Sequence, residues 1–246
     1  MNYETIRVRC QDEACSVQLY RPHAGNAFSQ LMVEECTDLL SQHTGSVKIV
    51  VLEGLADVFC PGADLQEVGQ EKQLDPESIY DLWLKLATGP FITIAHVQGK
   101  ANAGGVGFVA ASDIVIASAK AQFSLSELLF GLMPACVLPF LARRVGVQKA
   151  NYMALMTNPV SAQQALSWGL VDAYEAESEV LLHRHLLRLS RISKDAVSRY
   201  KQYAGGLDRL LEEFRFPAVS ANREVFSNDR NLEAIARYRD KGLLEL

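Results

Sequence analysis

The sequence has 246 residues, of which 49% are hydrophobic and 22% charged, and its formal net charge is −5. This length fits one large domain or a domain with a small appendage, and the mild negative charge argues against nucleic-acid binding. No apolar run reaches the roughly 18 residues of a membrane span, and the first residues lack a signal-peptide pattern, so we expect a cytoplasmic protein. The five cysteines have irregular spacing, so we expect reduced, mostly buried thiols and no metal site.

Segments with strand and helix character alternate along the first half of the chain. Two short runs of alternating polarity predict a hairpin, and Ser29 then caps a predicted helix. Continuous apolar runs predict buried parallel strands, and the segments between them have helical spacing. Such alternation indicates an α/β fold with a parallel sheet and helices on its faces. The predicted strands are residues 5–10, 14–20, 47–54, 91–99 and 113–118.

The second half of the chain is predicted to be almost entirely helical from Pro134 onwards. One of the predicted helices spans residues 141–156, and the exception to the helical pattern is a short strand near residues 170–174. The final helices are amphipathic, so each must bury an apolar stripe against the body or against a neighbouring subunit. We therefore divide the chain into an α/β body, residues 1–190, and a C-terminal helical region, residues 191–246.

Three segments suggest a catalytic site. The first, VFCPGADLQE, has a Pro-Gly turn that leaves the amide of Ala63 bare at an expected helix start. The second, ANAGGVG, offers the amide of Gly104 at another strand-to-helix turn. Two such donors that converge would form an oxyanion hole, which stabilises a thioester enolate. The third, AQFSLSELLFG, sets Glu127 in apolar surroundings, which raise a carboxyl pKa and suit acid–base chemistry.

Each of these features also has a purely structural explanation. Gly62 and Gly104 fit turn geometry without any ligand. Glu127 fits the first turn of a helix, where acidic residues are common. The functional interpretation depends on the three segments occurring together, in order, around two buried strands.

Along nearly its whole length the sequence resembles the crotonase, or enoyl-CoA hydratase/isomerase, superfamily. The matching stretches are RPHAGNAFS, VFCPGADLQE, VQGKANAGGVGF, DIVIASAKAQFSLSELLFGLMP and NPVSAQQALSWGLVDA. The resemblance implies a crotonase/ClpP-like spiral of ββα turns, a C-terminal helical region that packs on a neighbour, and trimers or paired trimers.

The resemblance also assigns roles to individual residues. Ala63 and Gly104 supply the oxyanion-hole amides, and Glu127 is the catalytic carboxylate. The channel for the pantetheine arm is implied to involve Ala24, Asp64 and Leu65, and Tyr80 lies on the helix that roofs the pocket. Tyr238 and Lys241 match an aromatic residue and a lysine that reach coenzyme A from the adjacent subunit.

Gly107 departs from the pattern of hydratases in this family. These hydratases carry two glutamates, one matching Glu127 and the other falling on Gly107. Addition of water to a simple enoyl thioester normally uses both groups. The sequence therefore argues against ordinary fatty-acid hydration, while Glu127 retains the means to move a proton at the α-carbon.

Within the superfamily the sequence most resembles the enzymes of polyketide β-branching. These dehydrate 3-hydroxy-3-methylglutaryl groups on an acyl carrier protein to 3-methylglutaconyl groups. The resemblance implies a hydro-lyase that needs no cofactor beyond the thioester carrier, and it leaves open whether acyl carrier protein or coenzyme A carries the substrate. The free carboxylate of that substrate calls for cations or donors, and the candidates are Lys85, Lys100, Arg143 and Arg144.

Several other residues have less specific patterns. Tyr80 could donate to the leaving hydroxyl, although packing against Trp83 accounts for it as well. His96 lies on a buried strand and is expected in the core. Cys60 and Cys136 have no His or Asp at triad-like spacing and are expected to pack.

Two other functions fit the same sequence. One is an isomerase or decarboxylase, because a 1,3-proton shift needs one carboxylate and decarboxylation mainly needs the oxyanion hole. The other is a non-catalytic crotonase-like subunit, which would have a filled pocket with Glu127 far from Ala63.

Overall fold

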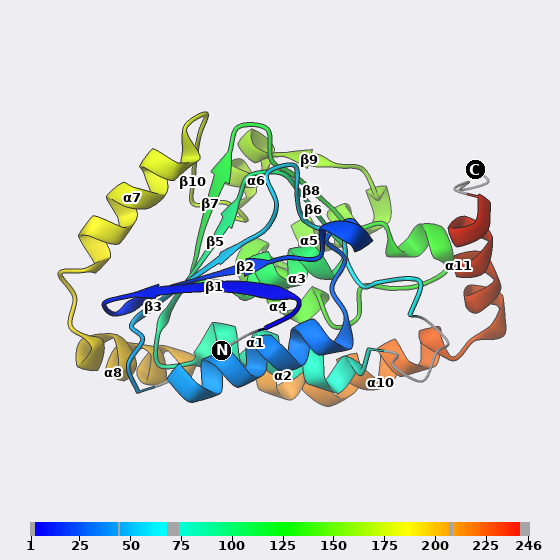
Figure 1. Cartoon of the computed structure of the whole chain (residues 1–246). Helices are drawn as coiled ribbons and strands as arrows, with labels where there is room; N and C mark the ends of the chain where they lie inside the picture. The colour runs from blue at the N-terminus through cyan, green and yellow to red at the C-terminus, as the bar shows by residue number, and fades with distance from the viewer. Residues whose placement is uncertain (1–2, 44, 68–73, 207–208, 242–246) are drawn as a thin grey trace.

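A computed structural model describes residues 3–43, 45–67, 74–206 and 209–241, without the side chains of His43 and residues 238–241. Its larger sheet has the strand order β1-β2-β3-β5-β7-β10 (Figure 1). β1 and β2 form the predicted antiparallel hairpin, and the other neighbours pair in parallel. The strands are β1 (Ile6–Gln11), β2 (Ala14–Leu19), β3 (Ile49–Glu53), β5 (Ile92–Val97), β7 (Ile114–Ser118) and β10 (Ala173–Glu175).

A smaller sheet has the order β4-β6-β8-β9, in which β4, β6 and β8 are parallel and β9 is antiparallel. Its strands are only two or three residues long, which explains why apolar periodicity does not reveal them. They are β4 (Val58–Cys60), β6 (Lys100–Asn102), β8 (Gln122–Ser124) and β9 (Val160–Ser161). Because neighbouring parallel strands end at one edge of a sheet, the segments that follow β4, β6 and β8 meet there.

Helices cover both faces of the larger sheet. Alternate residues of β3 point to opposite sides: Val50 and Leu52 belong to the main core, whereas Ile49 and Val51 belong to a second cluster with Leu181 of α7. The helices are α1 (Gln30–His43), α2 (Pro76–Thr88), α3 (Gly104–Ala111), α4 (Leu138–Val145), α5 (Val147–Met156), α6 (Ala162–Trp168), α7 (Ser178–Leu189), α8 (Lys194–Gly205), α9 (Leu210–Glu213), α10 (Arg215–Phe226) and α11 (Asp229–Lys241), with 3-10 turns η1 (Pro22–Ala24) and η2 (Glu127–Phe130).

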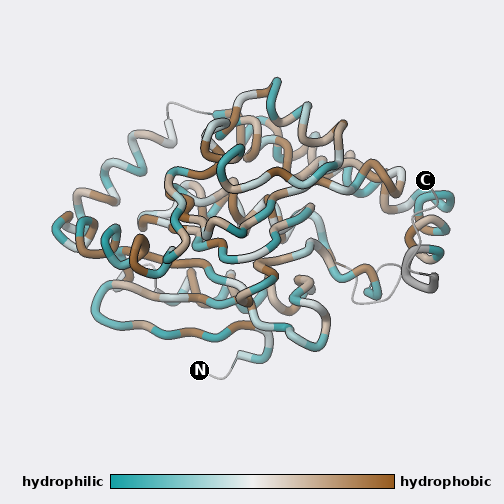
Figure 2. The backbone as a smooth tube through the Cα atoms, turned by 90° about the horizontal axis from the view of Figure 1, so that it is seen from above, coloured by the Kyte–Doolittle hydropathy of each residue, from teal (hydrophilic) through white to brown (hydrophobic). Residues whose placement is uncertain are grey.

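The C-terminal helices wrap the body (Figure 1). α10 lies against α2, where Arg215 pairs with Glu77 and Asp81, and Arg223 pairs with Asp75 and Glu77. Hydrophilic and hydrophobic residues alternate along the outer helices (Figure 2), as amphipathic helices require. None of the described helices is long and apolar enough to cross a membrane. The division at residues 190 and 191 stays a prediction.

Three local expectations are wrong. No helix begins at Asp64, because residues 61–67 form a turn instead. Residues 141–156 are not one helix, because Gly146, at φ +77°, separates α4 from α5. The cysteines are not all reduced: a disulfide joins Cys10 to Cys15, which lie directly opposite each other in β1 and β2, whereas Cys36, Cys60 and Cys136 are free and buried as expected.

Candidate active site

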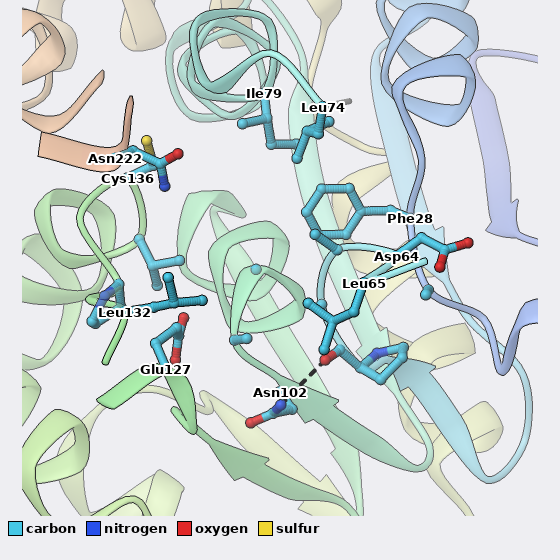
Figure 3. A pocket seen from close by; sticks show the side chains of 18 of the residues that line it. Phe28, Asp64, Leu65, Leu74, Ile79, Asn102, Glu127, Leu132, Cys136 and Asn222 are labelled. Atoms are coloured by element: carbon cyan, nitrogen blue, oxygen red, sulfur yellow. Dashed lines mark hydrogen bonds between the residues drawn. The ribbon is translucent and has the colours of Figure 1, made fainter. Parts of the chain in front are cut away.

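A cavity of about 510 Å³ lies where β4, β6 and β8 end. This volume is typical of pockets for small organic ligands. Apolar side chains, among them Phe28, Leu65 and Leu132, form much of its wall, and Glu127 lies near Leu132 (Figure 3). The cavity brings together most of the residues that the sequence assigned to the site: Ala24, Ala63, Asp64, Leu65, Gly104 and Glu127.

The turn after β4 leaves the amide of Ala63 free. Phe28 forms a short parallel β-bridge with this turn. Its N–H donates to the carbonyl of Gly62 at 3.0 Å, and its carbonyl accepts from the N–H of Asp64 at 3.0 Å. These bonds use the groups on either side of Ala63 and leave its own N–H without a partner among the described residues. Gly62 has φ +112°, a conformation that favours glycine, so the Pro-Gly sequence is what permits this turn.

The turn after β6 presents the amide of Gly104 beside that of Ala63. Gly104 is the first residue of α3, and its N–H has no partner in the described chain. The preceding Ala103 is held at φ +51°, a strained conformation of the kind found at functional sites. A Cβ placed on Gly62 would lie 3.0 Å from the Cβ of Ala103 and 3.7 Å from the nitrogen of Gly104, so the two turns touch. Two free amides thus lie at neighbouring turns, as an oxyanion hole requires.

Glu127 begins η2, directly after β8 and Ser126. Its Oε2 atom is buried and has no hydrogen-bond partner in the described structure. Burial favours the neutral form and raises the pKa of this carboxyl to about 7, although the backbone amides of Ser126 and Glu127 act in the opposite direction. A carboxyl with this pKa can accept and return a proton near neutral pH.

Asn102, which the sequence did not single out, links the turns that follow β4, β6 and β8. Its Nδ2 donates to Ser126 at 2.8 Å and to the carbonyl of Pro61 at 3.2 Å, and Figure 3 marks the second of these bonds. Its Oδ1 accepts from Ser124 at 2.8 Å. One side chain therefore ties the turn after β4 to the residues on both sides of the β8 end, next to Glu127. An asparagine just before a glycine-rich turn is the only signal in the sequence, and it is weak.

Trp83 occupies the space beside Gly107. A Cβ on Gly107 would lie 2.3–2.7 Å from three atoms of the indole ring, so this glycine allows the ring to pack against α3. The ring is 1% exposed and meets Phe108 and Phe140 edge-on, at centroid distances of 5.7 and 5.8 Å. The bare position of Gly107 is therefore filled by an aromatic side chain that also lines the cavity.

Gly105 has a different reason to be glycine. A Cβ there would lie 2.1 Å from the carbonyl oxygen of Cys60, so α3 packs directly on β4. Its role is close packing between these two elements.

Tyr80 does not reach the cavity. It is fully buried, its hydroxyl donates to the carbonyl of Leu211 at 2.6 Å, and its ring packs against Phe140 at 5.0 Å. Burial raises the pKa of this phenol above its ordinary value, so the hydroxyl keeps its proton. The structure therefore does not support the predicted contact between Tyr80 and substrate, because the hydroxyl of Tyr80 donates inside the protein.

Arg21, a residue that the sequence did not single out, holds two residues that line the cavity. Its guanidinium donates to the carbonyl of Ala27 at 2.9 Å and pairs with Asp64 at 3.0 Å and Glu67 at 3.3 Å. The Asp64 carboxylate thus points away from the cavity centre (Figure 3), and Ala24 is among the residues that line the cavity.

None of the cations proposed for a substrate carboxylate lines the cavity in the described part of the chain. Arg144 donates to the carbonyls of Leu170 at 2.8 Å and Ser112 at 2.9 Å and pairs with Asp172. Lys85, Lys100 and Arg143 also lie elsewhere. Amide side chains are present instead, from Asn102 and from Asn222 of α10 (Figure 3).

His96 and Cys60 are buried in the core, as expected, whereas Cys136 lines the cavity. His96 is 1% exposed and lies between Glu53 at 3.0 Å and Ser178 at 2.9 Å, away from the cavity. Burial raises the pKa of Cys60 and Cys136 to about 12, so neither is a thiolate at neutral pH. The side chains of Tyr238 and Lys241 lie outside the described part of the structure.

Residues 9–243 match the enoyl-CoA hydratase/isomerase family, and the chain therefore belongs to this family. The predicted family and the crotonase-like fold are both confirmed.

Individual members of this family are similar to the chain over most of its length. The chain is 51% identical over 249 residues to the bacillaene synthase dehydratase PksH of Bacillus subtilis, covering 98% of this chain and 96% of that protein. A crystal structure of the polyketide biosynthesis enoyl-CoA hydratase PksH from Bacillus subtilis matches with a TM-score of 0.95 and 52% identity, covering 98% and 99% of the two chains. A probable enoyl-CoA hydratase of Rhodobacter capsulatus is 32% identical over 75% of this chain and 73% of that protein.

Proposed function

We propose that this protein is a dehydratase that converts 3-hydroxy-3-methylglutaryl-acyl carrier protein to 3-methylglutaconyl-acyl carrier protein in polyketide β-branching. Similarity to a polyketide dehydratase along nearly the whole chain supports this reaction class. The observation that carries the proposal is Glu127, a buried carboxyl with a pKa of about 7 that shares one cavity with two free amides.

In the first step the thioester carbonyl accepts hydrogen bonds from the amides of Ala63 and Gly104. The Glu127 carboxylate removes a proton from the α-carbon, and the negative charge moves to the thioester oxygen. Each amide donor is worth about 3–4 kcal/mol to this enolate, by comparison with oxyanion holes in general. Glu127 is then neutral, the state that its surroundings favour.

In the second step Glu127 returns its proton to the β-hydroxyl. The enolate electrons form the double bond between the α- and β-carbons, the carbon–oxygen bond breaks, and water leaves. Glu127 ends as a carboxylate, so protons and charge balance over the cycle. One carboxyl can perform both transfers because its pKa lies near neutrality.

The carrier arm would enter past Ala24, Asp64 and Leu65, which line the cavity at its mouth. We further propose that Tyr238 and Lys241 contact the carrier from a neighbouring subunit of a homotrimer or hexamer. Free coenzyme A would suit the same channel. The scheme uses no cofactor other than the thioester carrier and operates in the cytoplasm.

The non-catalytic alternative loses support from the open cavity that Glu127 and Ala63 both line. The isomerase and decarboxylase alternatives make different predictions for product mass. Intact-mass analysis of a 3-hydroxy-3-methylglutaryl carrier protein distinguishes them, because dehydration removes one water, decarboxylation removes carbon dioxide, and isomerisation leaves the mass unchanged.

We expect the parent protein to remove water from this substrate and Glu127→Gln to do so at least about 1,000-fold more slowly, since the only proposed base is lost. Glu175→Gln, at the exposed last position of strand β10, is the matched control and should retain parental activity. Parental activity in Glu127→Gln would remove Glu127 from the mechanism, and a loss of carbon dioxide would replace the assigned reaction.

A further inference from the structure

Two buried side-chain atoms in the described structure lack any hydrogen-bond partner: Trp83 Nε1 and Glu127 Oε2. Trp83 and Glu127 both line the same cavity. Buried polar atoms are nearly always paired, so an unpaired one beside a cavity indicates a group that a ligand satisfies. One of these atoms is a hydrogen-bond donor and the other an acceptor, so the cavity can both hold an oxygen atom and accept a proton.

The indole of Trp83 is held in a fixed position. It lies on α2, is 1% exposed, and is enclosed by Phe108, Phe140 and the bare backbone of Gly107. Its Cε2 atom, which is bonded to Nε1, would lie 2.7 Å from a Cβ on Gly107. Because the ring cannot turn away without disturbing this packing, the direction of the N–H is set before substrate binds.

An indole N–H donates a hydrogen bond but does not release its proton at neutral pH. It can therefore hold and polarise an oxygen atom, while the proton itself must come from elsewhere. In the proposed reaction Glu127 supplies that proton, and the oxygen in need of a donor is the β-hydroxyl.

The carboxylate of the substrate is the other group that could accept the hydrogen bond from Trp83. The charges around the cavity disfavour a carboxylate at this position. The charged residues that line the described cavity are Asp64, Glu67 and Glu127; Arg21 pairs with the first two, and no described lining residue is a cation. A carboxylate beside a buried, uncharged donor would stay largely uncompensated. A neutral hydroxyl needs only one such donor.

We propose that Trp83 Nε1–H donates a hydrogen bond to the β-hydroxyl of the substrate and holds its oxygen towards Glu127. This role rests on the proposed dehydration. Trp83 keeps its proton throughout; the proton that completes the water comes from Glu127, and the electrons of the breaking carbon–oxygen bond leave with that oxygen. The hydrogen bond from Nε1–H to this oxygen strengthens as negative charge develops on the oxygen, so Trp83 contributes more to the transition state than to binding.

Trp83→Phe tests this role, because it removes the donor and keeps most of the ring. We expect kcat for dehydration to fall about 10- to 100-fold, as for loss of one aligned donor. The inhibition constant of a 3-methylglutaryl carrier protein, which lacks the hydroxyl, should change by about twofold or less. Trp168→Phe is the matched control, since Trp168 packs against Tyr152 outside the cavity and should leave the rate unchanged.

A second substrate separates the hydroxyl from the carboxylate. A 3-hydroxy-3-methylbutyryl carrier protein has the hydroxyl and no carboxylate, so Trp83→Phe should slow its dehydration by the same factor. A loss confined to the glutaryl substrate would assign the N–H to the carboxylate and overturn the proposal, as would an undiminished kcat in Trp83→Phe.

A spectroscopic measurement tests the contact without turnover. In the Glu127→Ala protein labelled with ¹⁵N-tryptophan, the Trp83 indole signal, assigned by its loss in Trp83→Phe, should move on addition of the 3-hydroxy-3-methylglutaryl carrier and much less with the 3-methylglutaryl carrier. The Trp168 signal is the internal reference. Equal shifts with both ligands would contradict the contact. A parent enzyme that fails to dehydrate would instead refute the proposed function, whatever Trp83 does.

Discussion

Glu127 owes its chemistry to its surroundings. In water a glutamic acid is ionised at neutral pH, but burial of Oε2 raises the pKa of this group to about 7. The same burial has a thermodynamic consequence for the fold. Because the folded state holds the proton more tightly than the unfolded state, stability from this group falls as pH rises from about 4.5 to 7.

Glu127→Gln should therefore stabilise the protein at alkaline pH. The amide cannot ionise, so the variant avoids the buried charge that the parent carries above pH 7. We expect the free energy of unfolding of the variant to exceed that of the parent by up to about 2–3 kcal/mol at pH 8, with little difference at pH 4.5. Urea titrations at both pH values and one protein concentration measure this. A gap that is constant or that widens towards acid pH would contradict the raised pKa.

Some residues of the site can be recognised from the sequence, and others cannot. Ala63 and Gly104 lie in glycine-containing turns, and Glu127 is a single carboxylate in an apolar segment. These local patterns can be recognised in the sequence. Trp83 reads as an ordinary apolar position of an amphipathic helix, and only its packing against Gly107 relates it to the site. Tyr80, three residues earlier, has the same pattern and points elsewhere, because the carbonyl of Leu211 captures its hydroxyl.

At the scale of elements, the site depends on three short parallel strands that end side by side. The long buried strands of the larger sheet could be predicted because each is a continuous apolar run. The strands β4, β6 and β8 have three residues each, too few for any periodicity, so their shared edge appears only in the folded protein. The sequence thus identifies the turns that hold Ala63, Gly104 and Glu127. The spacing of these residues along the chain does not show that the three turns lie next to one another.

Asn102 should be needed to keep these turns in place. Asn102→Ala removes three hydrogen bonds and leaves Ser124 and Ser126 without their amide partner. We expect kcat to fall about tenfold with a smaller change in KM, and the free energy of unfolding to fall by about 1–3 kcal/mol.

Gln122→Ala, at an exposed position of β8, is the control for Asn102 and should leave both quantities unchanged. Parental kcat in Asn102→Ala would show that the turns hold their geometry without this side chain.

At the scale of the whole molecule, several large apolar side chains are left exposed on the outer helices. Val147 and Leu155 of α5 are 75% and 64% exposed, and Phe216 of α10 is 78% exposed. Large exposed apolar side chains leave water when another subunit covers them, which favours association. They support the proposed homotrimer, in which each apolar stripe finds a partner.

Sedimentation equilibrium should give about three or six times the chain mass of 27.2 kDa. Leu155→Asp together with Phe216→Asp should shift the protein towards smaller species, because charge in a buried interface is costly. A parent protein that sediments as a monomer at micromolar concentration would contradict the trimer.

The central claim is that one carboxyl, Glu127, accepts the α-proton and returns it to the leaving hydroxyl. The dependence of kcat/KM on pH tests this most directly. Glu127 must begin as a carboxylate, so kcat/KM should rise with pH through about 7 and then remain level, since burial raises the pKa of the cavity thiol Cys136 to about 12. A bell-shaped profile that falls again between pH 8 and 10 would reveal a separate acid and contradict the claim.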